Sequence, residues 1–342
     1  MKEQIHGGDI YRHPHVLDFS SNINPLGTPK SVVDAAAESL NRLSNYPDIG
    51  YTELKRALAD YEKQPESNII CGNGAAELIF SLVFALRPKK AVLPAPTFAE
   101  YGQALEAIAC EIISYPMKKL RLDEDIFSFL TEDIDLLFLC NPNNPTGFLT
   151  EQSFLLRILE HCRKKGIFLV ADECFLDFVD DGEKYSLKPM VKDCDSLFLL
   201  KAFTKRYAMA GIRLGYGISG NGELLTAMGR VTQPWNVSIP AQAAGVAALK
   251  EREYVKKAQA LVREERDYLK KEMARLGLQV YDSQANYIFF QGPSDLYERC
   301  LEEGILIRDC SNYPGLGRGY FRTAVKNHRE NIQLIAVLEK VL

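Results

Sequence analysis

A lysine, an aspartate and an asparagine each follow shortly after a run of apolar residues. They are Lys205, Asp172 and Asn144, and a fourth apolar run leads into a glycine-rich turn that ends at Gly74. A lysine amine has a pKa near ~10.4 and is a poor nucleophile at neutral pH. As a Schiff base with an aldehyde cofactor, however, it becomes a group that substrate amines can displace. This set of residues therefore indicates a site for an aldehyde cofactor.

The other groups that such a cofactor requires are also present. A cofactor that acts as an electron sink needs a carboxylate beside its ring nitrogen, and Asp172 suits that role. A cofactor phosphate needs a helix N-terminus and a cation, which Gly74-Ala75 and Arg213 provide. Taken singly, each residue has an ordinary structural explanation, because a strand-end aspartate is commonly a turn or cap residue. Only their combination, order and spacing favour the cofactor site.

The elements that position these residues follow from the hydrophobic pattern. Near-continuous apolar runs are typical of parallel strands covered on both faces, and the stretches between them have helical patterns. We expect strands at residues 68–71, 91–93, 135–140, 167–171, 196–200 and 213–218. Helices are expected at 75–86, 98–109 and 151–165, the last capped by Thr150, with a long charged helix at 252–277. This pattern indicates an α/β sheet domain. Because ligands bind beyond the carboxyl ends of such strands, the four segments should meet there.

Composition excludes several function classes. The net charge of −4 disfavours a nucleic-acid partner, and no apolar stretch is long enough to suggest a membrane span. His6, Gly7 and Gly8 stand where a secretory signal would need an apolar core. The eight cysteines form no C-x-x-C pair and no metal-like group with histidine, so no metal is expected. They are typical of reduced thiols in a cytoplasmic protein.

Three motifs carry a resemblance to a known family. Residues 204–216, which contain Lys205 and Arg213, resemble the lysine signature of the class I and II aminotransferases, which use pyridoxal 5'-phosphate (PLP). Residues 143–147 are similar to the asparagine motif of that family, and Asp172-Glu173 to its aspartate motif. The resemblance spans essentially the whole chain. It implies the α/β PLP-dependent transferase fold type I, with a mostly parallel sheet covered by helices in the large domain and a smaller α+β domain. The expected division is an N-terminal segment 1–38 that joins the small domain, a large PLP-binding domain 39–245 and a small C-terminal domain 246–342.

The family resemblance assigns cofactor roles residue by residue. Lys205 should form the Schiff base, Asp172 should pair with the pyridinium nitrogen, Asn144 should contact the ring hydroxyl oxygen, and Phe98 should stack on the ring. Four residues should bind the cofactor phosphate: Gly74, Ala75, Thr204 and Arg213. Tyr51 should reach the phosphate of the neighbouring subunit, which implies a homodimer. Without the resemblance, Phe98 is equally typical of a core aromatic and Tyr51 of a surface tyrosine.

One position departs from the family pattern. Ala202 lies three residues before the lysine, where a serine or threonine commonly donates a hydrogen bond to the cofactor phosphate. The missing bond is worth roughly 1.5–3 kcal/mol when the acceptor is charged.

Within the family, two subfamilies compete. The segment His6-Gly7-Gly8 with residues 18–27, Phe175 where many aminotransferases have tyrosine, and residues 307–316 resemble the threonine-phosphate decarboxylases of cobalamin synthesis. This resemblance implies a doubly anionic amino-acid phosphate as substrate, and two arginines with a histidine suit such a ligand. The implied substrate-binding residues are His6, Gly7, Asn22, Asn144, Arg308 and Arg322.

Alternatives remain at this stage. Histidinol-phosphate aminotransferase is the alternative enzyme, and Arg308 could instead form a surface salt bridge. A PLP-sensing regulator is expected to carry a DNA-binding domain ahead of the fold, whereas here the fold is expected to begin almost at Met1. Sequence names the residues that hold the substrate but not which Cα bond stands perpendicular to the cofactor ring. The choice between decarboxylation and transamination, and between phosphothreonine and phosphoserine, therefore stays open.

Overall fold

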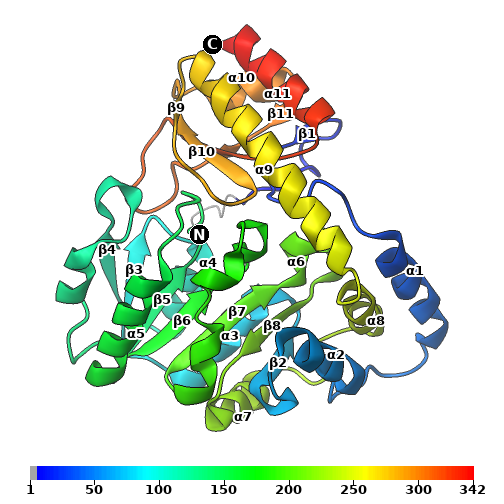
Figure 1. The fold of residues 1–342 in the computed structure, drawn as a ribbon, viewed down its shortest axis with the longest axis vertical. Helices are drawn as coiled ribbons and strands as arrows, with labels where there is room; N and C mark the ends of the chain where they lie inside the picture. Colours follow the sequence, from blue (N-terminus) through cyan, green and yellow to red (C-terminus); the bar gives the residue numbers. More distant parts are fainter. Residues whose placement is uncertain (1–5) are drawn as a thin grey trace.

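A seven-stranded, mostly parallel sheet forms the centre of the computed structural model, which describes residues 6–342 (Figure 1). Its strands lie in the order β2-β8-β7-β6-β5-β3-β4. Strand β8 runs antiparallel to both of its neighbours, and the other pairs are parallel. The bounds are β2 (Ile69–Gly72), β3 (Lys90–Ala95), β4 (Glu111–Pro116), β5 (Leu136–Cys140), β6 (Phe168–Asp172), β7 (Leu197–Ala202) and β8 (Gly215–Ile218).

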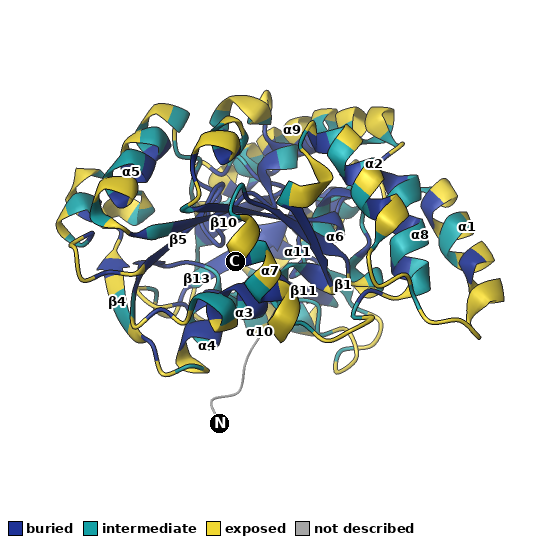
Figure 2. Ribbon diagram, turned by 90° about the horizontal axis from the view of Figure 1, so that it is seen from below, coloured by how far each residue is buried: buried dark blue, intermediate teal, exposed yellow. Residues whose placement is uncertain are grey.

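Helices cover both faces of this sheet, because alternate side chains of each strand point to opposite faces. Leu136 and Phe138 join one apolar cluster, together with helices α3, α4 and α7. Leu137 and Leu139 join the other, together with α2, α5 and α8. Figure 2 shows the buried sheet between helices whose outer faces are exposed. The bounds are α1 (Lys30–Ser39), α2 (Thr52–Glu62), α3 (Gly74–Leu86), α4 (Ala99–Glu106), α5 (Gln152–Lys165), α6 (Phe203–Arg206), α7 (Gly222–Val231) and α8 (Ile239–Ala248).

A second, smaller sheet is antiparallel and lies in the order β12-β13-β10-β9. Helix α11 packs against α9 and α10 beside it, and the short strand β1 pairs with β11. The bounds are β1 (Leu17–Asp18), β9 (Gln279–Val280), β10 (Tyr287–Gln291), β11 (Ile305–Leu306), β12 (Arg308–Asp309), β13 (Tyr320–Ala324), α9 (Arg252–Arg275), α10 (Leu296–Glu302) and α11 (His328–Val341). The N-terminal segment therefore pairs with β11 through β1, and the carbonyl of Phe19 accepts from the N–H of Ala324 at the end of β13, whereas α1 packs on α8. The domain division at residues 38 and 245 stays a prediction.

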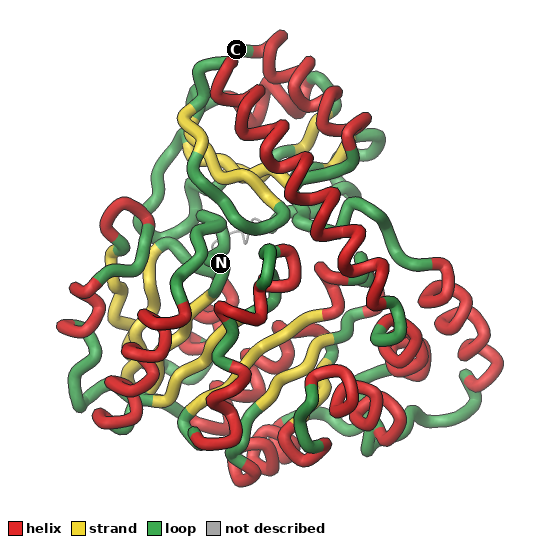
Figure 3. The backbone as a smooth tube through the Cα atoms, in the orientation of Figure 1, coloured by secondary structure: helices red, strands yellow, loops and turns green. Residues whose placement is uncertain are grey.

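The space between the two sheets contains mainly loops, as the tube in Figure 3 shows. The loops that follow β5, β6 and β7 enter this region, and the segment that follows β12 approaches it from the smaller sheet. Side chains from both parts of the chain can therefore meet at the carboxyl ends of the parallel strands.

The structure corrects several sequence-based expectations about elements. All six expected strands are present, with ends that differ by one or two residues, and β4 is an additional edge strand. Helix α4 ends at Glu106 and not at residue 109. The prediction that Thr150 caps α5 is wrong: Glu151 occupies the cap position, and the backbone N–H of Thr150 donates to the side chain of Asn141.

All eight cysteines are buried, and none forms a disulfide within residues 6–342. No helix within residues 6–342 combines the length and apolar character needed to cross a lipid bilayer.

Candidate functional site

A cavity of about 260 Å³ opens at the carboxyl ends of β5, β6 and β7. It receives side chains from the large sheet, from the N-terminal segment and from the smaller sheet. Twelve residues singled out in the sequence line it: His6, Gly7, Asn22, Ala75, Phe98, Asn144, Asp172, Thr204, Lys205, Arg213, Arg308 and Arg322. The structure thus brings these residues together, while the role of each stays a prediction.

Lys205 lies on the short helix α6, directly after β7. Its Nζ is 5.9 Å from the centroid of the Phe175 ring. Burial, and after it the positive charge of Arg322, lower the pKa of Lys205 to about 8. A larger fraction of this amine is therefore neutral near neutral pH than for an exposed lysine, which suits a nucleophile.

Asp172 is the last residue of β6 and is held by two donors. The hydroxyl of Tyr101 donates to Oδ2 at 2.5 Å, and the backbone N–H of Cys174 donates to Oδ1 at 2.9 Å. Burial raises the pKa of Asp172, and these two hydrogen bonds oppose that change because they favour the carboxylate. A cationic N–H group in the cavity would favour the carboxylate further, so the site suits a protonated ring nitrogen.

The start of α3 forms a cradle for an anion. Gly74 has a φ of +82°, and a Cβ atom there would lie 2.4 Å from Nη2 of Arg213. Only glycine therefore allows the guanidinium to approach the first turn of the helix so closely. The positive end of α3 and the Arg213 cation together suit a phosphate group.

Asn144 lies on the loop after β5, and its Oδ1 accepts a hydrogen bond from Nη1 of Arg322. The neighbouring Asn143 fixes this loop, because its Nδ2 donates to the carbonyl of Pro96 at 3.1 Å and to Oγ1 of Thr146 at 3.0 Å. Loop 141–147 is thereby tied to the segment that precedes α4. That segment carries Phe98, the N-cap residue of α4.

Two buried arginines enter the cavity from the smaller sheet. Arg308 is 5% exposed, and its Nη2 donates to Asn312 at 2.8 Å, so the alternative of a surface salt bridge is wrong. Arg322 is 6% exposed, and its Nη2 donates to the carbonyl of Ser20 at 3.0 Å. Guanidinium groups on the wall of a cavity suit carboxylate and phosphate groups, so this arrangement fits an anionic ligand.

Three buried polar atoms on the cavity wall have no hydrogen-bond partner within residues 6–342. They are Oδ1 of Asn22, Oε2 of Glu100 and Nε of Arg322. Buried polar atoms are normally paired, so each unpaired atom needs an explanation. Their position on one cavity fits a polar ligand that supplies the missing partners.

Two of the sequence-predicted residues do not line the cavity. Gly74 lies next to the guanidinium of Arg213, which itself lines the cavity. Tyr51 contacts Asn236 through its hydroxyl, and Asn236 in turn donates to Glu77 on the first turn of α3. Within one chain, Tyr51 therefore stands outside the cavity. Ala202 lines it with a methyl group and donates no hydrogen bond from its side chain.

Sequence reasoning missed several residues of the site. Glu100, Tyr313 and Ser20 line the cavity, and Tyr101 orients Asp172 from behind it. Ser20 and Tyr313 lie in segments 18–27 and 307–316, which the family resemblance had singled out without giving these two residues a role, and Glu100 and Tyr101 lie two and three residues after Phe98. A glutamate in the first turn of a helix is ordinarily a solvated residue, so its type and position did not distinguish it.

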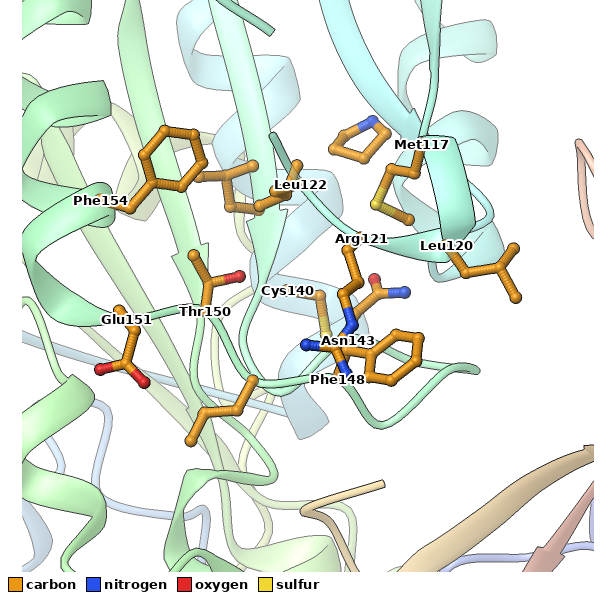
Figure 4. A pocket seen from close by; sticks show the side chains of 13 residues that line it. Met117, Leu120, Arg121, Leu122, Cys140, Asn143, Phe148, Thr150, Glu151 and Phe154 are labelled. Atoms are coloured by element: carbon orange, nitrogen blue, oxygen red, sulfur yellow. The ribbon is translucent and has the colours of Figure 1, made fainter. Parts of the chain in front are cut away.

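Figure 4 shows a second cavity, of about 200 Å³. Cys140 lines both cavities. Asn143, from the loop after β5, lines the second cavity, which contains neither Lys205 nor Asp172. Its wall is largely apolar, and the guanidinium of Arg121 lies 4.0 Å from the centroid of the Phe148 ring. This cavity lacks the acid, amine and asparagine of the first, which is therefore the candidate active site.

Comparisons with known proteins agree with this geometry. The threonine-phosphate decarboxylase of Salmonella typhimurium is 38% identical over 98% of this chain and 96% of its own length. The crystal structure of the histidinol-phosphate aminotransferase from Clostridium acetobutylicum has a TM-score of 0.89 at 31% identity, covering 95% of this chain and 99% of that one. The L-threonine-O-3-phosphate decarboxylase structure from Porphyromonas gingivalis has a TM-score of 0.82 at 25% identity and covers 94% and 98%. The family model for aminotransferase class I and II matches residues 14–338. The chain belongs to the aminotransferase class I and II family.

Proposed function

We propose that this protein is a PLP-dependent decarboxylase that converts L-threonine O-3-phosphate into (R)-1-amino-2-propanol O-2-phosphate and carbon dioxide, a step of cobalamin synthesis. The observation that carries the proposal is the presence of three arginines, Arg213, Arg308 and Arg322, in one cavity. Arginine is the side chain best suited to carboxylate and phosphate groups. Three guanidinium groups match three anionic groups: the cofactor phosphate, the substrate carboxylate and the substrate phosphate.

The residues present fit the cofactor. Arg213 and the start of α3 would hold its phosphate, Asp172 its ring nitrogen and Lys205 its aldehyde carbon. Phe98 would cover the ring, and Asn144 would donate to the ring hydroxyl oxygen. When bound, PLP supplies an electron sink for the electron pair that bond cleavage leaves at Cα.

The protein residues determine which bond breaks. Arg322 would hold the substrate carboxylate, and its own guanidinium is fixed by Asn144 and by the carbonyl of Ser20. His6, Asn22 and Arg308 would hold the phosphate. The bond between Cα and the carboxylate carbon breaks, carbon dioxide leaves, and a proton takes its place on Cα. The amine of Lys205 is the group of this chain best placed to deliver that proton, because its pKa is close to the working pH.

The surface beside Tyr51 supports a homodimer. Four exposed apolar residues lie shortly before Tyr51 in the sequence: Leu40, Leu43, Tyr46 and Ile49. Trp235 is exposed as well. Tyr46 stacks on Trp235 with ring centroids 4.5 Å apart. Exposed apolar patches mark interaction sites, and a two-fold dimer pairs one patch with its own copy. We therefore propose a homodimer in which Tyr51 reaches the cofactor phosphate of the partner subunit.

We also propose a cytoplasmic location. Eight buried free thiols are typical of a reducing compartment, where disulfides are rare.

A comparison of substrates tests the proposed reaction. Purified enzyme loaded with PLP is supplied separately with phosphothreonine, phosphoserine, and histidinol phosphate plus a keto-acid acceptor. The expected result is the highest kcat/KM for phosphothreonine, with an amine and carbon dioxide as products. Faster turnover of histidinol phosphate, with transfer of its amino group to the acceptor, would assign the chain to the alternative enzyme.

A further inference from the structure

Glu100 is a buried acid on the wall of the candidate active site for which the proposed reaction has no role. It is the second residue of α4 and lines the same cavity as His6 and Arg308. Its side chain is 18% exposed, and Oε1 lies 3.8 Å from Nδ1 of His6. The other oxygen, Oε2, is buried without a hydrogen-bond partner within the described chain. A polar atom in this position needs either a ligand or a proton to justify its burial.

The charge of Glu100 conflicts with the proposed substrate. The cavity should receive a carboxylate and a phosphate, and an ionised Glu100 would repel both. The titratable groups that face Glu100 come from five parts of the chain: His6 from the N-terminal segment, Asp172 from β6, Lys205 from α6, Arg308 from β12 and Tyr313 from the loop after β12. Only three of these groups can carry a positive charge, and the substrate anions compete for the same cations.

Two influences act in opposite directions on the protonation of Glu100. The N-terminus of α4 favours the carboxylate, and Lys205 and Arg308 favour it too. Burial favours the neutral acid and is the larger effect, since it raises the pKa of Glu100 to about 7. The protonation state of this side chain therefore changes within the range where the enzyme works.

The N-terminal segment holds His6 next to Glu100. A Cβ atom on Gly7 would lie 2.3 Å from the carbonyl oxygen of Ser20, so only glycine allows the two backbones to pack so closely. The N–H of Gly8 donates to Oγ of Ser20 at 2.7 Å. The carbonyl of Ser20 also accepts from Arg322. Ser20 therefore holds the segment that carries His6 and also orients Arg322. Glu100 faces His6 from α4.

We propose that Glu100 is a specificity-determining residue of this cavity. As a neutral acid it donates a hydrogen bond to the anionic end of the substrate, beside His6 and Arg308; as a carboxylate it repels that end. This inference rests on the proposed function, because it requires a phosphorylated substrate. It follows that substrate binding takes up a proton when the pH is above about 7, since an anion next to Glu100 raises its pKa further.

The first test compares pH profiles of kcat/KM, which report the titration of the free enzyme. Glu100→Gln keeps a hydrogen-bond donor of the same size but cannot ionise. The expected result is that kcat/KM of the wild type for phosphothreonine falls, relative to Glu100→Gln, by up to about tenfold per pH unit above neutrality. The titration of His6 and of the substrate is common to both proteins, so the ratio isolates Glu100. Glu106→Gln removes an exposed acid from the same helix and should follow the wild type.

The second test measures proton uptake without turnover. Lys205→Ala protein loaded with PLP is titrated with phosphothreonine by calorimetry near pH ~8, in two buffers that differ in ionisation enthalpy. The Lys205→Ala protein should take up more protons per site than the Lys205→Ala/Glu100→Gln double variant, by up to one proton. Protons exchanged by the substrate and by the other side chains are common to both proteins, so the difference isolates Glu100. Parallel pH profiles for the wild type and Glu100→Gln, or equal proton uptake in the single and double variants, would overturn the inference. Absence of carbon dioxide release by the wild type would instead contradict the proposed function, and calorimetry would still decide the protonation of Glu100.

Discussion

At the scale of single residues, Arg308 and Arg322 differ in their surroundings and should differ in their substrates. Arg322 is fixed by Asn144, which is expected to contact the cofactor ring, and by the carbonyl of Ser20 in the N-terminal segment. Arg308 contacts Asn312 and lies 5.4 Å from the Tyr313 ring centroid, on the side of the smaller sheet. We therefore assign the carboxylate to Arg322 and the substrate phosphate to Arg308.

The two arginine variants test this assignment. Losing a buried, charge-assisted contact to phosphate costs roughly 2–4 kcal/mol in transition-state binding. Arg308→Ala should therefore lower kcat/KM for phosphothreonine about 30- to 1000-fold and hardly change the poor turnover of unphosphorylated threonine. Arg322→Ala should lower both, because both substrates carry a carboxylate. Equal losses on the two substrates in Arg308→Ala would show that this residue serves the carboxylate or the fold.

The part of the cavity wall at the strand ends could be predicted at this scale, because strand ends meet at one edge of the sheet. Lys205, Asp172 and Asn144 were found in this way, whereas four other residues were named only through the family resemblance: His6, Asn22, Arg308 and Arg322. Glu100 and Tyr101 were not predicted, because their roles depend on which side of α4 faces the cavity. An acid in the first turn of a helix is normally solvated, and nothing in its sequence neighbourhood shows that Glu100 is buried.

At the scale of elements, a buried ion pair joins the ends of β6 and β7, which lie next to Asp172 and Lys205. Lys201 on β7 places its Nζ 3.1 Å from Oε2 of Glu173, which directly follows β6, and both side chains are less than 5% exposed. Glu173 also accepts from the hydroxyl of Ser186 and from the N–H of Leu187. This contact holds the ends of β6 and β7 in register next to Asp172 and Lys205.

Removing one partner of this pair should be costly. Lys201→Ala leaves the Glu173 carboxylate buried without its cation, and such a loss destabilises a protein by about 3–5 kcal/mol. The matched control is Lys256→Ala, since Lys256 is 71% exposed and pairs with Glu253 at 2.8 Å. That variant should change the free energy of unfolding by less than about 1 kcal/mol. Denaturant unfolding measures the free energy of unfolding of both variants. An equal loss of stability in the two would show that Lys201 does not have this structural role.

The strands were predictable because parallel strands covered on both faces have continuous apolar runs. Strand β4 was missed because it is an edge strand in which Glu111 and Ser114 are exposed. The antiparallel direction of β8 could not be predicted, because the spacing of apolar residues is the same in both directions. The Thr150 cap failed because α5 begins at Gln152, one residue later than expected, which places Glu151 at the cap position.

At the scale of the whole molecule, the position of Tyr51 outside its own cavity is consistent with a site shared between two chains. Its hydroxyl contacts Asn236, close to the exposed stack of Tyr46 on Trp235. Sequence reasoning could name Tyr51 only through the family resemblance, since a dimer interface has no periodic signal.

Hybrid dimers test the shared site. Tyr51→Ala and Lys205→Ala should each be strongly impaired, and mixing them should create dimers with one intact site. Random exchange places about one quarter of all sites in the intact form, so activity should rise towards that fraction of the wild type. Subunit exchange is confirmed independently by mass spectrometry of differently tagged chains. If exchange is complete and activity does not recover, each cavity works with its own residues alone.

The central claim is that this chain removes the carboxylate of a phosphorylated amino acid, and the fate of the carboxyl carbon tests it most directly. Enzyme loaded with PLP is incubated with carboxyl-labelled phosphothreonine without any amino acceptor. The account predicts one labelled carbon dioxide for each phosphothreonine consumed, no keto acid, and no release by Lys205→Ala. Label that stays in a phosphorylated keto acid, or release of carbon dioxide that does not depend on Lys205, would contradict the account.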